Sequence, residues 1–208
     1  MRKLLLVSIS ILGFALVAHA LTQGGAVDRS EVSQLVEVLR IDAGDTVADV
    51  GAGDGRWAIA LSDAVGESGR IYATEVDAND LKQIRARVER EGVANVTVVQ
   101  GDQEDTGLAD ACCDAILLRR VYHHFQHPQR MQSELKAALR ADGRLLIIDF
   151  DTRPSWRRPA GVPDSRHGHG ISKEMLVTEM QQSGFELVED MKWPNGDYAL
   201  LFRASVID

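Results

Sequence analysis

Three glycines alternate directly after an apolar run in the stretch VADVGAGDGRW, residues 47 to 57. Alternating glycines remove side chains from a turn, so a bulky ligand can lie against the bare backbone. The apolar run before them, which includes Asp49, is typical of a buried strand. A strand, a glycine turn and a helix in this order predict a cofactor site at the carboxyl end of a parallel sheet.

The spacing of the glycines separates two classes of cofactor. Nicotinamide and flavin dinucleotides favour G-x-G-x-x-G, whose third glycine permits close packing of the helix. Here Arg56 stands at that third position, and Gly55 comes one residue earlier. A nicotinamide-dependent oxidoreductase is therefore the weaker alternative.

The stretch RRVYHHF, which follows the apolar run DAILLR, holds the catalytic candidates. These are Tyr122, His123 and His124, because histidine titrates near neutrality and can remove a proton from a hydroxyl or amine. The alternative is that one histidine stacks beneath the cofactor and the other caps a helix. His127, His167 and His169 also invite a metal interpretation, but the sequence does not place a full set of ligands, and we assign no metal.

Residues 151–170 are rich in proline, glycine and arginine and show no hydrophobic period, which is typical of a long loop. Trp156, Arg157 and Arg158 combine an aromatic group with positive charge, and this favours an anionic or aromatic ligand. We interpret the loop as a substrate lid. A solvated, flexible loop is the alternative.

The elements that must position these residues alternate between strand and helix patterns. Strands are expected at residues 46–50, 70–75, 95–102, 114–119 and 143–150. Apolar strands separated by helices predict a parallel sheet covered on both faces. Two more strands, at 185–191 and 198–205, flank an Asn-Gly hairpin signal. The predicted fold is α/β, a doubly wound, mostly parallel seven-stranded sheet with a C-terminal antiparallel hairpin.

Local signals predict where several helices begin and end. Ser30 and Ser172 are expected to cap the first and last helices. Pro128 suits the first turn of another helix, which Asp142 and Gly143 are expected to close.

Together these motifs resemble the class I S-adenosylmethionine-dependent methyltransferases over about residues 30–203. G-x-G-x-G preceded by an acidic residue resembles motif I of that family, and IYATEVD and VVQGDQED follow in the family's order. The resemblance implies a Rossmann-like fold with S-adenosylmethionine as cofactor. The cofactor-binding residues that it implies are Asp49, Gly51, Ala52, Gly53, Gly55, Glu75, Val76, Asp102 and Gln103.

The resemblance also implies a role for each acidic position. Glu75 would bind the ribose hydroxyls, Asp102 and Gln103 would lie at the adenine, and Asp49 would face the cofactor's ammonium group, directly or through water. The alternatives are capping or solvation for Asp49 and Glu75, and an ordinary turn for Asp102. The expected reaction is methyl transfer to a small-molecule acceptor, which positioning can largely promote because the leaving group is neutral.

The first twenty residues have the layout of a secretory signal peptide, with Arg2 and Lys3, an apolar run at residues 4–17, and a cleavage site after Ala20. We expect residues 21–29 to be a linker and residues 30–208 to be the methyltransferase domain. The protein is then exported and periplasmic, with no stable membrane span after cleavage. An uncleaved membrane anchor is the alternative. Because S-adenosylmethionine is made in the cytosol, an exported binding module without turnover is a second functional hypothesis.

Composition limits the partners. The chain has 208 residues and a formal net charge of −8, so we expect a small-molecule partner and no nucleic acid. The oligomeric state is left open. Cys112 and Cys113 are adjacent, and because neighbours rarely meet disulfide geometry we expect them to be unpaired.

Overall fold

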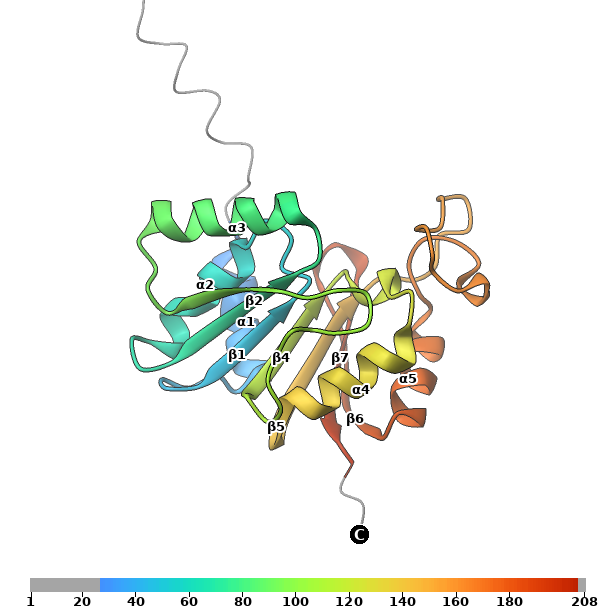
Figure 1. The fold of residues 1–208 in the computed structure, drawn as a ribbon. Helices are drawn as coiled ribbons and strands as arrows, with labels where there is room; N and C mark the ends of the chain where they lie inside the picture. Colours follow the sequence, from blue (N-terminus) through green and yellow to red (C-terminus); the bar gives the residue numbers. More distant parts are fainter. Residues whose placement is uncertain (1–26, 206–208) are drawn as a thin grey trace, which may run out of the picture.

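The computed structural model describes residues 27–205, which form one seven-stranded sheet with helices on both faces (Figure 1). The strand order is β3-β2-β1-β4-β5-β7-β6. The strands are β1 (Thr46–Val50), β2 (Arg70–Glu75), β3 (Val96–Gln100), β4 (Cys113–Arg119), β5 (Leu139–Asp149), β6 (Phe185–Lys192) and β7 (Tyr198–Ala204). β1 to β5 pair in parallel, and β7 pairs antiparallel with both β5 and β6. The predicted fold class is confirmed.

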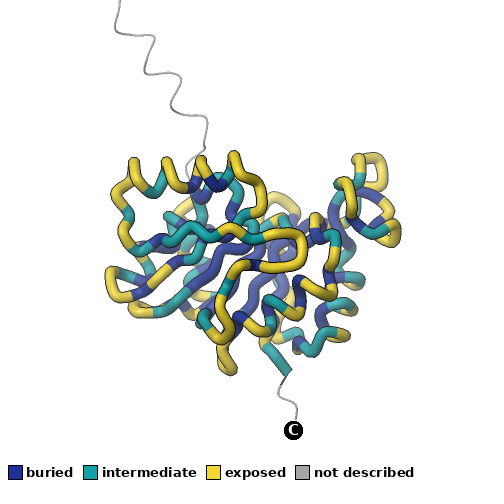
Figure 2. The backbone as a smooth tube through the Cα atoms, viewed as in Figure 1, coloured by how far each residue is buried: buried dark blue, intermediate teal, exposed yellow. Residues whose placement is uncertain are grey.

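Two hydrophobic cores lie on opposite faces of the sheet because successive strand residues point to opposite sides. Val47 packs in the core beneath the first three helices, and Ala48 packs in the other core. The helices are α1 (Arg29–Leu39), α2 (Arg56–Val65), α3 (Ala78–Glu91), α4 (Pro128–Ala138) and α5 (Lys173–Gln182). Both faces of β5 are covered, and Figure 2 shows buried residues running through the centre of the sheet.

The sheet divides at the neighbouring strands β1 and β4. β1 pairs with β2 on one side and with β4 on the other. The helix after β1 packs on one face of the sheet and the helix after β4 packs on the opposite face. Loops that leave in opposite directions open a crevice at the carboxyl ends of the strands. The glycine turn and the histidine segment are these two loops.

Two of the expected helix ends are wrong. Asp28, not Ser30, caps α1, because its carboxylate accepts hydrogen bonds from both the amide and the hydroxyl of Ser30. α4 does not run to Asp142 and Gly143 but ends at Ala138, and Leu139 already pairs with Cys113 in the sheet. Ser172 caps α5 as expected, since its hydroxyl accepts from the amide of Met175 at 3.3 Å.

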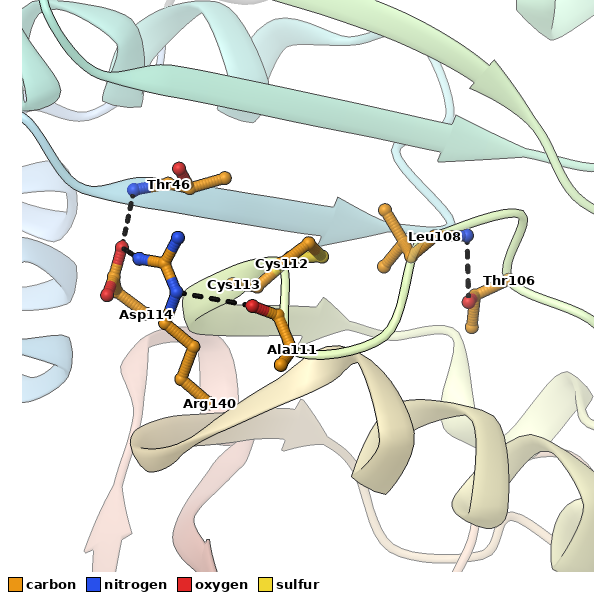
Figure 3. Close-up of a disulfide and its surroundings, with 8 residues drawn as sticks. All are labelled: Thr46, Thr106, Leu108, Ala111, Cys112, Cys113, Asp114 and Arg140. Carbon is orange, nitrogen blue, oxygen red and sulfur yellow. Dashed lines mark hydrogen bonds and ion pairs between the residues drawn. A yellow bond between two sulfur atoms is a disulfide. The ribbon is translucent and has the colours of Figure 1, made fainter.

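The expectation that the two cysteines are unpaired is also wrong, because Cys112 and Cys113 form a disulfide (Figure 3). The pairing of β4 with β5 is irregular here, because the step from Cys113 to Ala115 in β4 corresponds to the longer step from Leu139 to Arg144 in β5. Ala111 just before the pair has a positive φ of 48°. This irregular turn allows neighbouring side chains to meet, and it lies at the amino end of β4, away from the crevice.

The signal peptide and most of the linker lie outside the described residues. Within residues 27–205, no helix is both long enough and apolar enough to span a membrane.

Candidate active site

A cavity of about 490 Å³ opens at the carboxyl ends of the central strands. Its size is in the usual range for small-molecule sites. Five of the predicted cofactor-binding residues line it, namely Gly51, Glu75, Val76, Asp102 and Gln103. The other four, Asp49, Ala52, Gly53 and Gly55, are not among its lining residues.

The glycine turn is fixed against β2 by backbone hydrogen bonds. The carbonyl of Thr74 accepts from the amides of Gly51 at 3.0 Å and Ala52 at 2.9 Å. The Glu75 carboxylate accepts from the amide of Gly53 at 3.0 Å and from that of Val76 at 2.7 Å. Glu75 thus orients the turn from the neighbouring strand while its side chain also lines the cavity. A carboxylate has about four acceptor positions, so it retains capacity for a ligand.

Packing within the protein explains two of the three glycines. A Cβ on Gly51 would lie 2.4 Å from a Val121 methyl carbon, and one on Gly55 would lie 2.9 Å from Ile84. Only Gly51 also presents its backbone to the cavity. A Cβ on Gly53 would meet nothing within 4 Å, although its φ of 56° favours glycine. The glycine pattern therefore serves close packing of the turn as well as access to bare backbone.

Acidic side chains dominate the charge of the cavity wall. Asp80 and Asp105, which the sequence analysis did not select, join Glu75 and Asp102. Burial raises the pKa of Asp80, and the negative charge of Glu75 adds to the shift. Asp102 also shapes its own turn, since it accepts from the amides of Glu104 and Asp105. A wall with these carboxylates favours a cationic ligand over a pyrophosphate.

Arg120 is the cavity-lining cation that sequence reasoning missed. It forms a bidentate ion pair with Asp197 at 2.7 and 2.8 Å, and the Asp197 side chain is fully buried. This pair raises the pKa of Arg120 further above its ordinary value. Asp197 lies in the turn between β6 and β7, where the sequence indicated only a hairpin. No local sequence pattern could therefore predict that it pairs with Arg120.

Asp49 lies beneath the glycine turn with 2% of its surface exposed. Burial raises its pKa to about 7, the amide of Ala58 opposes the shift, and the charge of Glu75 adds to it. No described group donates a hydrogen bond to its Oδ2 atom. Asp49 does not line the cavity, so in this geometry it does not contact a ligand there directly.

The three catalytic candidates occupy different environments in the short helix η1 (Tyr122–His124). His124 lines the cavity, and desolvation followed by the neighbouring His123 and His169 lowers its pKa to about 4. Its imidazole is therefore neutral at pH 7 and a weaker base than a free histidine. His123 is buried, and its Nδ1 lies 2.7 Å from Asp149.

Tyr122 belongs to a buried hydrogen-bond network and does not line the cavity. Its hydroxyl donates to Glu179 at 2.8 Å and accepts from Gln132. Burial, then the negative charge of Glu179, raises its pKa well above the ordinary value. The structure gives Tyr122 a packing role on the α4–α5 side of the sheet, and no described contact aims it at a ligand.

The loop at residues 151–170 approaches the cavity through small residues and not through its charged ones. Pro159 and Ala160 line the cavity, whereas the predicted substrate-binding residues Trp156, Arg157 and Arg158 do not. Arg158 forms an ion pair with Asp164 in the same loop, and Trp156 stacks with Arg153 at 4.4 Å. The predicted substrate contacts therefore stay untested, and the loop's basic charge is partly neutralised within the loop.

Residues 48–147 match the family model described as a methyltransferase domain. Over this stretch the chain is similar to methyltransferase domains. The matched stretch contains the glycine turn, Glu75, Asp102 and the histidine segment.

Individual relatives show the same similarity. The chain is 30% identical over 120 residues to an uncharacterized methyltransferase, YcgJ, of Bacillus subtilis, covering 57% of this chain and 46% of that protein. It is 28% identical over 116 residues to the ubiquinone/menaquinone biosynthesis C-methyltransferase UbiE of Pseudomonas putida, covering 55% and 45%. The matches thus span less than half the length of these curated relatives.

A solved structure shows the same fold over most of the chain. A SAM-dependent methyltransferase from Aquifex aeolicus superposes with a TM-score of 0.67 at 22% identity, covering 86% of this chain and 99% of that one. The Rossmann-like methyltransferase fold that the resemblance implied is therefore confirmed.

Proposed function

We propose that this protein is an S-adenosylmethionine-dependent methyltransferase acting on a small-molecule acceptor. The observation that carries the proposal is an acidic cavity, at the point where the sheet divides, that is walled by the Gly51 backbone and the carboxylates of Glu75 and Asp102. S-adenosylmethionine is a cation with hydroxyls on its ribose, so carboxylates suit it better than they suit the phosphates of a dinucleotide.

The residues present fit this cofactor. Glu75 is the candidate partner of the ribose hydroxyls, and Asp102 and Gln103 are the candidates at the adenine. The bound cofactor supplies an electrophilic methyl group whose departure leaves a neutral sulfide. The chain's own part is to fix donor and acceptor in line and to exclude water. Val121 and Phe125 contribute apolar surface to the cavity wall, next to His124.

His124 is the best-placed candidate to receive a proton from an acceptor. It is neutral at pH 7 and lines the cavity, whereas Tyr122 and His123 are engaged inside the protein. An anionic or aromatic acceptor was suggested by the loop at residues 151–170. Since Pro159 and Ala160 are the loop residues at the wall, we propose only that the acceptor is small and enters beside them.

The proposal is tested by calorimetric titration of the full-length protein with S-adenosylmethionine. A Glu75→Gln variant keeps an oxygen for the amide of Gly53 but removes the charge, so we expect affinity to fall at least tenfold, or about 1.4 kcal/mol. Glu89→Gln, at an exposed site on α3, is the matched control and should bind normally. A folded protein that binds no S-adenosylmethionine, or binds a nicotinamide cofactor better, would overturn the proposal.

We further propose that the domain is exported after cleavage at Ala20. The layout of residues 1–20 supports this, and intact-mass analysis of a periplasmic fraction should show a chain that begins at Leu21. A full-length chain in the cytosol would contradict it. An exported enzyme must meet its cofactor outside the compartment where the cofactor is made. The titration above tests whether the cofactor binds, and a measurement of methyl transfer to an acceptor distinguishes an enzyme from an exported binding module.

A further inference from the structure

Three histidines from two separate loops meet beside the cavity. His123 and His124 come from η1 after β4, and His169 comes from the loop that follows β5. Their ring centroids are 4.2 Å apart for His123 and His124, 4.9 Å for His123 and His169, and 5.4 Å for His124 and His169. One ring nitrogen from each lies within 4.8 Å of those of the other two.

His123 has an unused nitrogen inside the protein. Its Nδ1 faces Asp149 at 2.7 Å, and its side chain is 1% exposed. Its Nε2 is buried and has no hydrogen-bond partner among the described residues. A buried polar atom without a partner destabilises the fold, so a ligand on this nitrogen would be favourable.

Asp149 is itself fixed, and this fixes the ring of His123. The carboxylate accepts from the amides of His123 at 3.2 Å and Phe150 at 2.9 Å. Since a carboxylate is an acceptor, the proton of a neutral His123 belongs on Nδ1 and the lone pair on Nε2. A carboxylate that orients the far side of a histidine is the usual support of a metal-ligating imidazole.

His169 has a similar arrangement. Its Nδ1 lies 3.2 Å from the carbonyl of Arg157, which can only accept, so its Nε2 is also left with a lone pair. The carbonyl of His169 accepts from the amide of Arg153 at 2.7 Å, which fastens this end of the loop. Asp149 and the carbonyl of Arg157 therefore favour the same tautomer in the two rings, with the proton on Nδ1 and the lone pair on Nε2.

We propose that His123, His124 and His169 bind a divalent transition metal ion of the zinc class. Neutral imidazoles suit zinc, whereas magnesium and calcium require oxygen ligands. Tetrahedral coordination with Zn–N bonds of about 2.0–2.1 Å needs nitrogens roughly 3.3 Å apart, so small side-chain rotations must close the site. Three protein ligands leave a fourth position open, as in catalytic zinc sites.

The open position gives the metal a role that rests on the proposed function. His124 belongs both to this histidine cluster and to the cavity wall. It is the candidate proton acceptor only in the metal-free protein, because the lone pair of its ring is used in coordination when the metal is bound. A ligand at the fourth position would therefore lie beside the methyl-donor site, and an oxygen, nitrogen or sulfur atom of the acceptor suits it. Metal binding itself does not depend on methyl transfer and can be measured alone.

The test uses full-length protein made without a polyhistidine tag, stripped with a chelator and titrated with Zn²⁺. We expect one zinc per chain, with affinity reduced at least tenfold in both His124→Ala and His169→Ala. The matched controls are His127→Ala, on an exposed side chain beside Glu104, and His167→Ala, two residues from His169 in the same loop. Both controls should bind zinc as the unchanged protein does.

Two outcomes would overturn the proposal: no stoichiometric zinc, or equal affinity in His169→Ala and the unchanged protein. Co²⁺ in place of Zn²⁺ provides a second measurement that needs no change of residue. We expect a visible absorption spectrum typical of four-coordinate Co²⁺ with nitrogen ligands. Titration of the same His169→Ala protein with S-adenosylmethionine should give normal binding. Loss of zinc with retained cofactor binding would separate this site from the proposed methyl-donor site.

Discussion

Asp49 combines deep burial with a position directly under the glycine turn. Its pKa is raised from 3.8 to about 7, so the folded protein keeps a proton that the unfolded chain releases above about pH 4. The unfolded state therefore binds fewer protons between pH 4 and pH 7, and the free energy of unfolding falls as pH rises through this window. At higher pH the full contribution is reached and stays constant.

An Asp49→Asn variant should escape this loss because an amide does not ionise. We expect the variant to gain stability over the unchanged protein as pH rises from 4 to 8, by at most about 4 kcal/mol for a shift of about three pKa units. Urea unfolding at several pH values measures the difference. Asp63→Asn, at an exposed position on α2, should show no such trend. A flat difference for Asp49→Asn would mean that its carboxyl is ionised at little cost.

Residue types at the glycine turn could be predicted from the sequence because a positive φ and close packing leave few alternatives to glycine. Gly51 and Glu75 lie at the cavity wall as expected. Arg120 and Asp80 could not be found in this way. Charged residues are common on protein surfaces, and only the folded structure shows that these two line the cavity. His169 is 45 residues from His124 in the sequence, and the two rings meet only because the loop after β5 folds back toward η1.

At the scale of elements, the ion pair of Arg120 with Asp197 joins the end of β4 to the β6–β7 turn. Removing Arg120 would leave the Asp197 carboxylate buried and unpaired, which is costly, whereas an unpaired Arg120 can reach water because 40% of its side chain is exposed. We expect Arg120→Ala to lower the free energy of unfolding by about 2–4 kcal/mol. Denaturant unfolding at neutral pH measures this loss.

The double variant Arg120→Ala, Asp197→Asn supplies the check on that explanation. It should recover part of the loss, because the buried charge has been removed with its partner. Arg130→Ala, which breaks the pair between this exposed arginine and the half-buried Glu134, should cost less than about 1 kcal/mol. No recovery in the double variant would show that Arg120 stabilises the fold by packing and not by pairing.

The presence of each strand and helix was predicted more accurately than the residues at which some of them begin and end. β1 and β2 match the expected ranges because their apolar residues are bounded by turns on both sides. β5 begins four residues before the expected Gly143, since pairing of Leu139 with Cys113 overrides the Asp-Gly turn signal. Asp28 caps α1 because its carboxylate can reach the amide of Ser30. Such ends depend on tertiary partners that a local pattern does not contain.

At the scale of the whole molecule, the two halves of the sheet meet at one cavity. β1, β2 and β3 lead to Gly51, Glu75 and Asp102, whereas the β4 side provides Arg120 and His124. A ligand that contacts both halves should stabilise the domain as one cooperative unit. The fold followed from the sequence, whereas the acceptor stays a prediction, because the loop residues chosen for it are not among those that line the cavity.

Thermal unfolding with S-adenosylhomocysteine, the product of the proposed donor, tests this cooperativity. A ligand present at 100 times its dissociation constant adds about 2.7 kcal/mol, which should raise Tm by roughly 5–10 °C for a domain of this size. We expect a single transition that moves as a whole, since the ligand braces both halves of the sheet. NAD⁺ at the same concentration should leave Tm unchanged because the acidic wall disfavours its phosphates. Two separate transitions would contradict this prediction, because they would mean that the two halves of the sheet unfold independently.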